Sequence, residues 1–247
     1  GEEMIAFTSE QRFLVTGASS GIGEGVALLL NKQGATIIGI GRNQARLEAM
    51  KAKAAHPGNV FLENKDLAAD LAGLPDYVKS LKEKYGRFQG LAYCAGLSNI
   101  MPLRAVDIEL LQQIFAVNYY APVMMAKGFS DKRNNNGPGS AMVFMASVGG
   151  VRTDPGMTAY SGSKGALIAT MQSVAKELAP TGVRVNCVSP ALIETNMADE
   201  VSRQYAEGRY PMGLGKVSDV ANMVVFLLAQ ETRWITAQNY LMDCGLR

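Results

Sequence analysis

The sequence predicts an α/β fold in which a doubly wound parallel sheet is flanked by helices. Apolar strand segments alternate with helical segments along the chain, and a glycine-rich turn follows the first strand. A chain of 247 residues, 48% of them hydrophobic, is long enough for one domain of this class with a sizeable core. No linker or internal repeat interrupts the pattern, so residues 1–247 are expected to form a single domain.

The expected elements follow one another in regular order. The first strand is Arg12 to Thr16, and Asn43 has the side chain to cap the second helix. Apolar residues that run on without alternating, as in residues 35–40, are typical of strands covered on both faces. Further strands are expected at 35–40, 59–62, 88–94, 140–145, 183–188 and 239–242, and helices at 26–34, from 43, and at 71–85, 107–127, 158–178 and 217–228.

Two segments depart from this rhythm. Residues 134–139, Asn-Asn-Asn-Gly-Pro-Gly, predict a polar surface loop. Residues 190–213 are long for a simple connection, which favours a substrate lid. The apolar side chains of this segment could line a pocket or equally pack the lid onto the core; they are Leu192, Ile193, Met197, Val201, Tyr205, Tyr210 and Met212.

Composition excludes several classes of function. The net charge is +2 and basic residues are scattered, so nucleic acid is not expected as a partner. No apolar run has membrane length, so no membrane partner is expected either. Three cysteines and one histidine, His56, offer neither a disulfide framework nor a metal site. Sparse cysteine indicates a reducing compartment, most simply the cytoplasm.

The glycine-rich turn has the composition of a phosphate-binding loop. It reads Thr16-Gly17-Ala18-Ser19-Ser20-Gly21-Ile22-Gly23 and lies between the first strand and the first helix. Glycines permit close approach of the backbone to a pyrophosphate, and the helix offers free N–H groups and its positive dipole end. The turn therefore predicts a Rossmann-type dinucleotide site.

Four polar residues form the candidate catalytic set. Tyr160 and Lys164 are four residues apart on an expected helix and so share one face, where a protonated amine would lower the pKa of the phenol. Ser147 follows an expected strand, whose carboxyl end faces the ligand crevice. Asn118 lies within the long expected helix, and its alternative is an exposed or locally hydrogen-bonded residue.

These motifs together resemble the short-chain dehydrogenase/reductase family, and the resemblance covers nearly the whole chain. It implies that Tyr160 exchanges the proton, Lys164 holds the nicotinamide ribose and tunes Tyr160, Ser147 polarises the substrate carbonyl, and Asn118 supports a water relay. The resemblance and the glycine-rich turn imply cofactor contacts from Gly17, Ser19, Ser20, Gly21, Ile22, Gly23, Arg42, Asp66, Leu67, Ala95, Gly96, Tyr160, Lys164, Pro190, Ile193 and Thr195.

Three positions depart from the family's pattern. Cys94 replaces an asparagine after the fourth strand, Ala191 replaces a glycine after Pro190, and Cys244 replaces a glycine before Gly245. The first change is expected to alter hydrogen bonds between strands, and the second to restrict the hinge of the lid.

The second strand indicates which nicotinamide cofactor is preferred. An acid there would bind the adenosine ribose and repel a 2′-phosphate, but the chain has Gly41-Arg42-Asn43. A guanidinium suits phosphate, although a solvated arginine at a helix start is the alternative. The usual second basic residue is absent from the glycine-rich turn. NADP(H) is therefore favoured, with NAD(H) as the open second choice.

The expected function is NADP(H)-dependent interconversion of a small-molecule carbonyl and an alcohol. The alternative from another class is an NADP(H)-binding redox sensor or scaffold without turnover. Resemblance to 3-oxoacyl-carrier-protein reductases places Arg133 and Lys176 roughly where those enzymes meet an acidic acyl carrier protein, although both could be ordinary surface charges. Other small ketones, sugars or steroid-like carbonyls stay open as substrates. The resemblance also implies a homodimer or homotetramer built on helices 107–127 and 158–178.

Overall fold

A computed structural model describes residues 5–194, 204 and 208–246. Seven strands form one parallel sheet in the order β3-β2-β1-β4-β5-β6-β9. Their bounds are β1 (Arg12–Thr16), β2 (Thr36–Gly41), β3 (Val60–Asn64), β4 (Gly90–Tyr93), β5 (Ala141–Met145), β6 (Arg184–Pro190) and β9 (Asn239–Met242). The predicted parallel sheet is confirmed, with strand ends shifted by a few residues.

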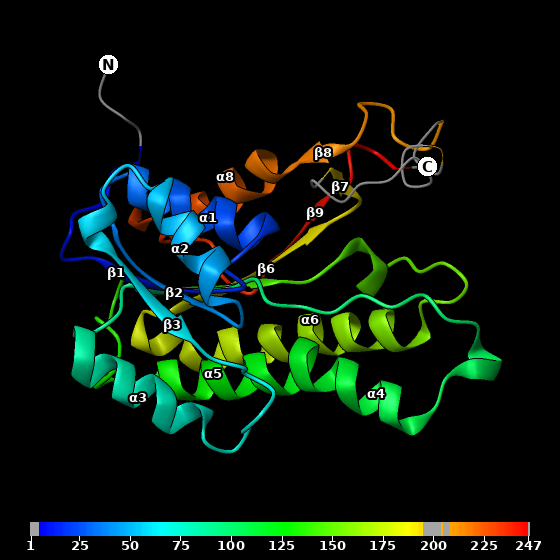
Figure 1. The fold of residues 1–247 in the computed structure, drawn as a ribbon, viewed down its shortest axis with the longest axis horizontal. Helices are drawn as coiled ribbons and strands as arrows, with labels where there is room; N and C mark the ends of the chain where they lie inside the picture. The colour runs from blue at the N-terminus through cyan, green and yellow to red at the C-terminus, as the bar shows by residue number, and fades with distance from the viewer. Residues whose placement is uncertain (1–4, 195–203, 205–207, 247) are drawn as a thin grey trace.

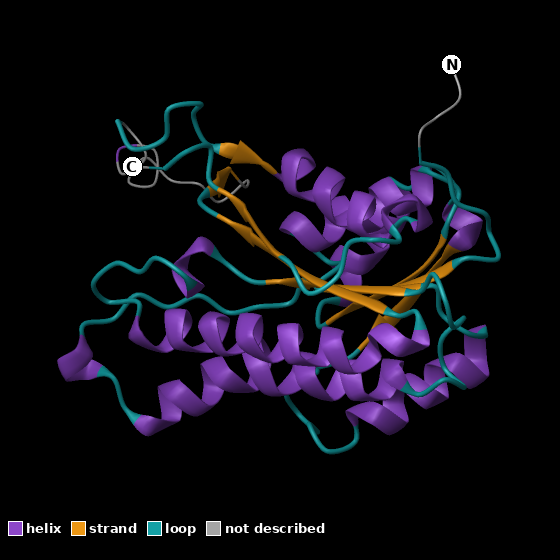
Figure 2. Ribbon diagram, turned by 180° about the vertical axis from the view of Figure 1, so that it is seen from behind, coloured by secondary structure: helices purple, strands orange, loops and turns teal. Residues whose placement is uncertain are grey.

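Helices cover both faces of the sheet (Figures 1 and 2). One layer holds α1 (Gly21–Lys32), α2 (Gln44–Ala52) and α8 (Val217–Leu228), and the other holds α3 (Leu74–Tyr85), α4 (Ile108–Phe115), α5 (Ala121–Ser130) and α6 (Thr158–Leu178). Each layer has its own apolar cluster against the sheet, one around Val26, Met50 and Val224 and one around Val78, Met125 and Leu167. The described chain therefore forms one three-layered domain.

The strand order places a crevice beside β1. The chain leaves β1 for β2 on one side, and β4 lies on the other side of β1. Connections that diverge from neighbouring strands leave an opening at the carboxyl ends of those strands, where ligands of such sheets bind. The turn after Thr16 and the loop after Tyr93 both lie at this edge.

The helix predicted over residues 107–127 contains a wider turn. Residues Ala116–Tyr120 between α4 and α5 form a π-helical segment with Asn118 at its centre. The Tyr93 hydroxyl donates a hydrogen bond of 2.8 Å to the Val117 carbonyl in this segment. Such single π turns occur often at functional sites, and the sequence spacing alone did not indicate this one.

The prediction that residues 134–139 form a surface loop is wrong for its first two residues. Asn134 and Asn135 are buried. Their amides donate hydrogen bonds of 2.8 Å to the carbonyls of Gly128 and Phe129, at the end of α5. The asparagines satisfy helix carbonyls that would otherwise lack partners, which explains why polar side chains are placed inside.

Short elements complete the fold. Strands β7 (Ile193–Glu194) and β8 (Gly215–Lys216) pair with each other in parallel. This pairing lies at the two ends of the segment expected to be a lid. Four residues of that segment, Thr195, Met197, Val201 and Tyr205, lie outside the described residues. The 3₁₀ turns are η1 (Pro57–Asn59), η2 (Leu103–Ala105), η4 (Val148–Gly150), η5 (Ala179–Thr181) and η6 (Gln230–Thr232).

Two features are absent from the residues that the structure describes. None of the helices among them combines the length and apolar character needed to cross a bilayer. Over the same residues, no group of three or more histidine, cysteine, aspartate or glutamate side chains is placed to hold a metal ion. Cys94, Cys187 and Cys244 are free thiols.

Candidate active site

The glycine-rich turn brings backbone close to backbone. Gly17 has φ +66° and Gly21 has φ +55°, a left-handed conformation that favours glycine. A Cβ on Gly17 would lie 2.9 Å from the Ala95 nitrogen, and a Cβ on Gly23 would collide with the Gly17 carbonyl oxygen. The turn is thus a cradle that side chains would fill, and it fits a pyrophosphate group.

A cavity of about 660 Å³ opens over this turn. Ten of the residues predicted to bind the cofactor line it, namely Gly17, Ser19, Ser20, Ile22, Gly23, Arg42, Asp66, Leu67, Ala95 and Gly96. Ser20 precedes α1 and its side chain caps no N–H group of that helix. The helix N-terminus therefore keeps donors and positive dipole directed at the cavity, as dinucleotide binding requires.

Sequence reasoning missed two cations of this cavity. Arg46, in the first turn of α2, and Lys65, directly after β3, line it together with Arg42. Asn43 caps α2 as predicted, by accepting a hydrogen bond of 3.0 Å from the Arg46 backbone N–H. The motifs for phosphate recognition lie in the glycine-rich turn and at the end of the second strand, and Lys65 lies outside both.

Asn118 is buried and makes three side-chain hydrogen bonds. Its oxygen accepts from the Leu97 N–H at 2.8 Å, and its nitrogen donates to the Leu97 carbonyl at 2.9 Å and to the Ser163 hydroxyl at 3.0 Å. Ser163 in turn donates to the Tyr160 carbonyl at 2.7 Å. The side chain of Asn118 therefore clamps the loop after β4 to α6, and it has no donor left for a water.

Ser147 and Tyr160 face each other across the site. Ser147 follows β5, and its oxygen accepts a hydrogen bond of 3.0 Å from the Gly149 N–H. Burial raises the pKa of Tyr160, and a hydrogen bond with Ser147 acts in the opposite direction. Tyr160 is therefore a neutral phenol at pH 7, a proton donor next to a second hydroxyl.

Lys164 is buried one helical turn beyond Tyr160. Its ammonium donates a hydrogen bond of 2.8 Å to the Met145 carbonyl and lies 5.8 Å from the centre of the Tyr160 ring. Burial lowers the pKa of Lys164 to about 8. The sequence predicts that this amine lowers the pKa of the phenol; in the structure burial dominates instead, and the net pKa shift of Tyr160 is upward.

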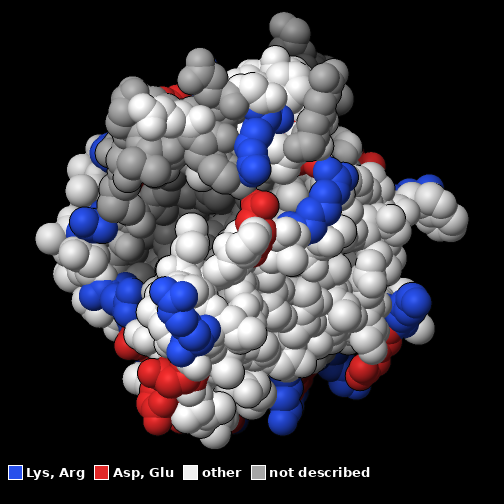
Figure 3. Space-filling view, turned by 90° about the vertical axis from the view of Figure 1, so that its right-hand side faces the viewer, with Lys and Arg blue, Asp and Glu red and all other residues white. Residues whose placement is uncertain are grey.

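Gly96 joins the cavity to the catalytic set. It lines the cavity, and a Cβ placed on it would lie 3.4 Å from the Lys164 ammonium and 3.5 Å from the Asn118 oxygen. Because no side chain intervenes, the far end of a molecule in the cavity would meet Lys164. Figure 3 shows one face of the molecule with a hollow and several lysine or arginine side chains around it.

Other predicted cofactor residues do not line the cavity. Gly21 lies in the turn without facing the cavity, Pro190 is buried at the end of β6, and Ile193 packs against the core from β7. Thr195 lies outside the described residues.

The three departures from the family's pattern have different structural consequences. The N–H of Cys94 still has a partner, since it donates to the Thr16 hydroxyl at 3.0 Å. Ala191 has an ordinary negative φ, so its extra methyl imposes no backbone strain. Cys244 has φ +47°, a left-handed conformation in which the glycine of the family would carry no steric cost.

Comparison with known proteins agrees with this geometry. A family model described as enoyl-(acyl carrier protein) reductase matches residues 17–247. The 3-oxoacyl-[acyl-carrier-protein] reductase of Thermotoga maritima is 31% identical over 94% of this chain and 96% of its own length. Galactitol 2-dehydrogenase of Agrobacterium fabrum is 29% identical over 94% and 95% of the two chains.

The structural comparison gives the same family. A short-chain dehydrogenase from Burkholderia cenocepacia, solved in complex with NADP, has a TM-score of 0.88, 29% identity and coverage of 95% of this chain and 97% of its own. The chain belongs to the short-chain dehydrogenase/reductase family. It is an oxidoreductase acting on alcohol and carbonyl groups, in a family that uses nicotinamide cofactors.

Proposed function

We propose that this protein interconverts a small-molecule carbonyl and its alcohol with NADP(H), using Tyr160 as the acid and base. The juxtaposition of Tyr160 with Ser147 at the Lys164 end of the cavity carries the proposal. A neutral phenol can donate a proton to a carbonyl oxygen as negative charge develops there, and an adjacent hydroxyl can stabilise that charge.

Each residue of the set has a distinct task in this proposal. The cofactor supplies or accepts the hydride when bound. Ser147 donates a hydrogen bond to the carbonyl oxygen, and Tyr160 delivers the proton to it. Lys164, which lies beside Gly96, would hold the nicotinamide ribose. Asn118 keeps the Leu97 loop and α6 in register, so that the cavity and the phenol stay aligned.

The competing function is a redox sensor or scaffold that binds NADP(H) without turnover. Such a protein has no use for a phenol, a hydroxyl and a buried amine at the end of its cofactor cavity. Initial rates of cofactor oxidation over a panel of ketones, aldehydes, sugars and steroid-like carbonyls, run with NADPH and with NADH, separate the two functions. Cofactor binding with no oxidation across the panel would favour the sensor.

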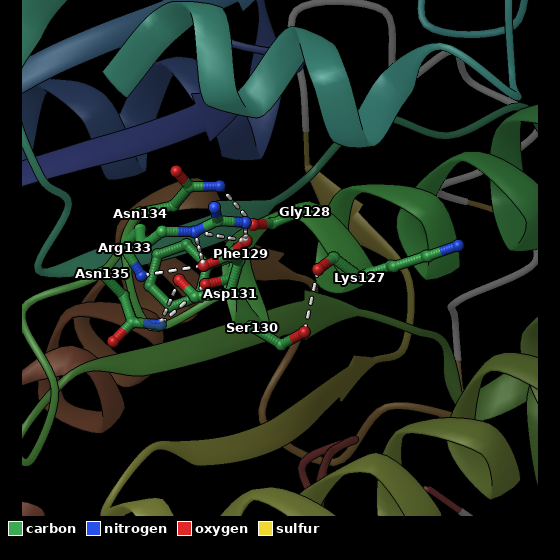
Figure 4. A network of polar contacts seen from close by, with 8 residues as sticks. All are labelled: Lys127, Gly128, Phe129, Ser130, Asp131, Arg133, Asn134 and Asn135. Carbon is green, nitrogen blue, oxygen red and sulfur yellow. Dashed lines mark hydrogen bonds and ion pairs between the residues drawn. The ribbon is translucent and has the colours of Figure 1, made fainter. Parts of the chain in front are cut away.

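An acyl carrier protein is the candidate partner among macromolecules. The Thermotoga maritima relative is named for a carrier-linked substrate, which makes this the second candidate. The Arg133 Nε donates a hydrogen bond of 3.0 Å to Asp131 within the network of Figure 4, and this ion pair lies on the surface. That guanidinium holds the pKa of Asp131 well below its usual range. Lys176 is exposed on α6. Comparing a free 3-oxoacyl thioester with its carrier-bound form tests this choice.

Arg42→Ala is expected to weaken NADPH binding by roughly tenfold and leave NADH binding nearly unchanged. A hydrogen bond to a charged group contributes about 1.5–3 kcal/mol, and exposure of Arg42 moves the loss toward the low end. Calorimetric titration of both cofactors measures this. Gly41→Asp would add the missing acid, but a Cβ at Gly41 lies 3.3 Å from Ser19, so Arg42→Asp is the better reciprocal variant. An equal loss of both cofactors would remove Arg42 from phosphate recognition.

We expect a homodimer or homotetramer in solution. Ile108 at the start of α4 and Tyr120 before α5 are exposed hydrophobic side chains, and both lie on residues 107–127, the first of the two segments proposed to pair. Light scattering at micromolar concentration tests this expectation, and a monomer under those conditions contradicts it.

The segment of residues 190–213 is proposed as the substrate lid, with its two ends held together by β7 and β8. Three free thiols suit a reducing compartment, and we infer a cytoplasmic location on that ground.

A further inference from the structure

The geometry points to Lys65 as a second cation that binds the 2′-phosphate of NADP(H), from the strand next to that of Arg42. This inference rests on the proposed preference for NADP(H). It assigns a specificity-determining role to a residue that follows the third strand, outside the segments in which the sequence indicates cofactor selection.

The pairing of β2 with β3 places Lys65 beside Arg42. Gly41 and Asn64 are partners in the parallel ladder, and the Lys65 N–H donates a hydrogen bond of 2.9 Å to the Gly41 carbonyl. The ladder therefore continues one residue beyond both strands. Neighbouring strands are about 4.8 Å apart, so Arg42 and Lys65 leave the sheet edge side by side. Both line the cavity.

The cations at this end of the cavity carry no paired acid. Elsewhere in the described chain Lys53, Lys84 and Arg152 form ion pairs with Glu24, Glu63 and Asp243. Among the described residues, the side chains of Arg42, Arg46 and Lys65 take part in no ion pair or hydrogen bond. Three unneutralised cations around one recess create a positive potential that favours a dianionic phosphate.

Two acidic residues flank Lys65 in the sequence, Glu63 and Asp66. Asp66 also lines the cavity, and its oxygen accepts a hydrogen bond of 2.9 Å from the Ala68 N–H. Glu63 is occupied, since it accepts hydrogen bonds from Lys84 at 2.7 Å and from the Tyr85 hydroxyl at 2.6 Å. Glu63 is thus paired with Lys84, and among the described residues Lys65 forms an ion pair with neither acid.

An aromatic ring of α3 restrains the ammonium of Lys65. This ammonium lies 5.2 Å from the centre of the Tyr77 ring, a cation–π contact. The Tyr77 hydroxyl is buried without a hydrogen-bond partner in the structure. A lysine restrained in this way loses less conformational freedom when a phosphate binds, which favours a specific contact over diffuse attraction.

The test compares ligands that differ only in the 2′-phosphate. Lys65→Met keeps most of the aliphatic stem over Tyr77 and removes the charge. Calorimetry would measure the binding of NADPH, NADH, 2′,5′-ADP and 5′-AMP to the whole protein. Lys53→Met, which removes an equal charge from a lysine paired with Glu24 away from the cavity, is the matched control. Lys65→Arg tests rescue, and thermal unfolding shows whether each variant is folded.

We expect Lys65→Met to weaken NADPH and 2′,5′-ADP by about fivefold to tenfold, and NADH and 5′-AMP by less than about twofold. Lys53→Met should change none of the four, and Lys65→Arg should restore most of the affinity. Unchanged NADPH binding in Lys65→Met, with Arg42→Ala still selective, would overturn the role of Lys65 alone. Equal losses for all four ligands would also overturn it. A wild type that does not distinguish NADPH from NADH would overturn the cofactor proposal together with this inference.

Discussion

Tyr160→Phe is expected to lower the rate of carbonyl reduction by about 10²–10⁴-fold, the usual contribution of a positioned acid or base. The change removes one oxygen and keeps the ring that packs beside Lys164. Cofactor affinity should persist, because the change removes only the oxygen that exchanges the proton and leaves Lys164 in place. Steady-state rates with the best carbonyl substrate, together with calorimetry for NADPH, measure both quantities.

The control for this variant is Ser161→Ala, the next residue on α6. The Ser161 hydroxyl pairs with the Thr153 hydroxyl at 2.7 Å, and the proposed reaction gives it no task. Its removal should leave turnover within about threefold. If Tyr160→Phe retained more than a few per cent of the wild-type rate, roughly the upper limit for loss of a general acid, Tyr160 would not be the proton donor.

Lys164→Met is expected to damage turnover and cofactor affinity together while stabilising the folded protein at pH 7. Burial holds the pKa of Lys164 at about 8, below its unfolded value of about 10.5, so folding at pH 7 confines a charge in an unfavourable environment. Methionine fills the space without that charge. Allowing for the hydrogen bond to Met145 that is lost, the free energy of unfolding should rise by about 1–3 kcal/mol.

The stability advantage of Lys164→Met over the wild type should decrease as pH rises. Below pH 8 the amine is protonated in both the folded and the unfolded chain, so the full cost of burial is present. Between pH 8 and about 10.5 the folded chain has released the proton and the unfolded chain still holds it, so the wild type becomes relatively more stable as pH rises. Urea denaturation at pH 7 and pH 9.5 should therefore show the advantage of Lys164→Met shrinking. Unchanged cofactor affinity in this variant would show that Lys164 does not hold the ribose.

Local patterns in the sequence were sufficient for much of the site. The glycine-rich turn and the spacing of Tyr160 and Lys164 are short-range signals, because a turn and one helical face depend on neighbouring residues only. The parallel sheet followed from alternating apolar segments. Strand β4 begins at Gly90 rather than at Phe88, because Phe88 forms a separate parallel bridge with Asn135.

Features set by long-range pairing were not visible in the sequence. Lys65 lies beside Arg42 only because β2 and β3 are neighbours in a particular register. The π turn at Asn118 comes with contacts to Leu97, Ser163 and Tyr93, which lie on three other segments. The burial of Asn134 depends on where α5 ends. Burial raises the pKa of Tyr160, and burial cannot be predicted from the spacing of Tyr160 and Lys164.

Transfer of the hydride itself is the most direct measurement of the proposed function. The protein would be mixed with NADPH deuterated at the transferred position and with the carbonyl that reacts fastest in the panel, and the alcohol would be analysed by mass spectrometry. We predict one deuterium on the carbinol carbon for each cofactor oxidised, with the yield lost in Tyr160→Phe. Tight NADPH binding without deuterium in any alcohol product would contradict the proposed enzymatic function.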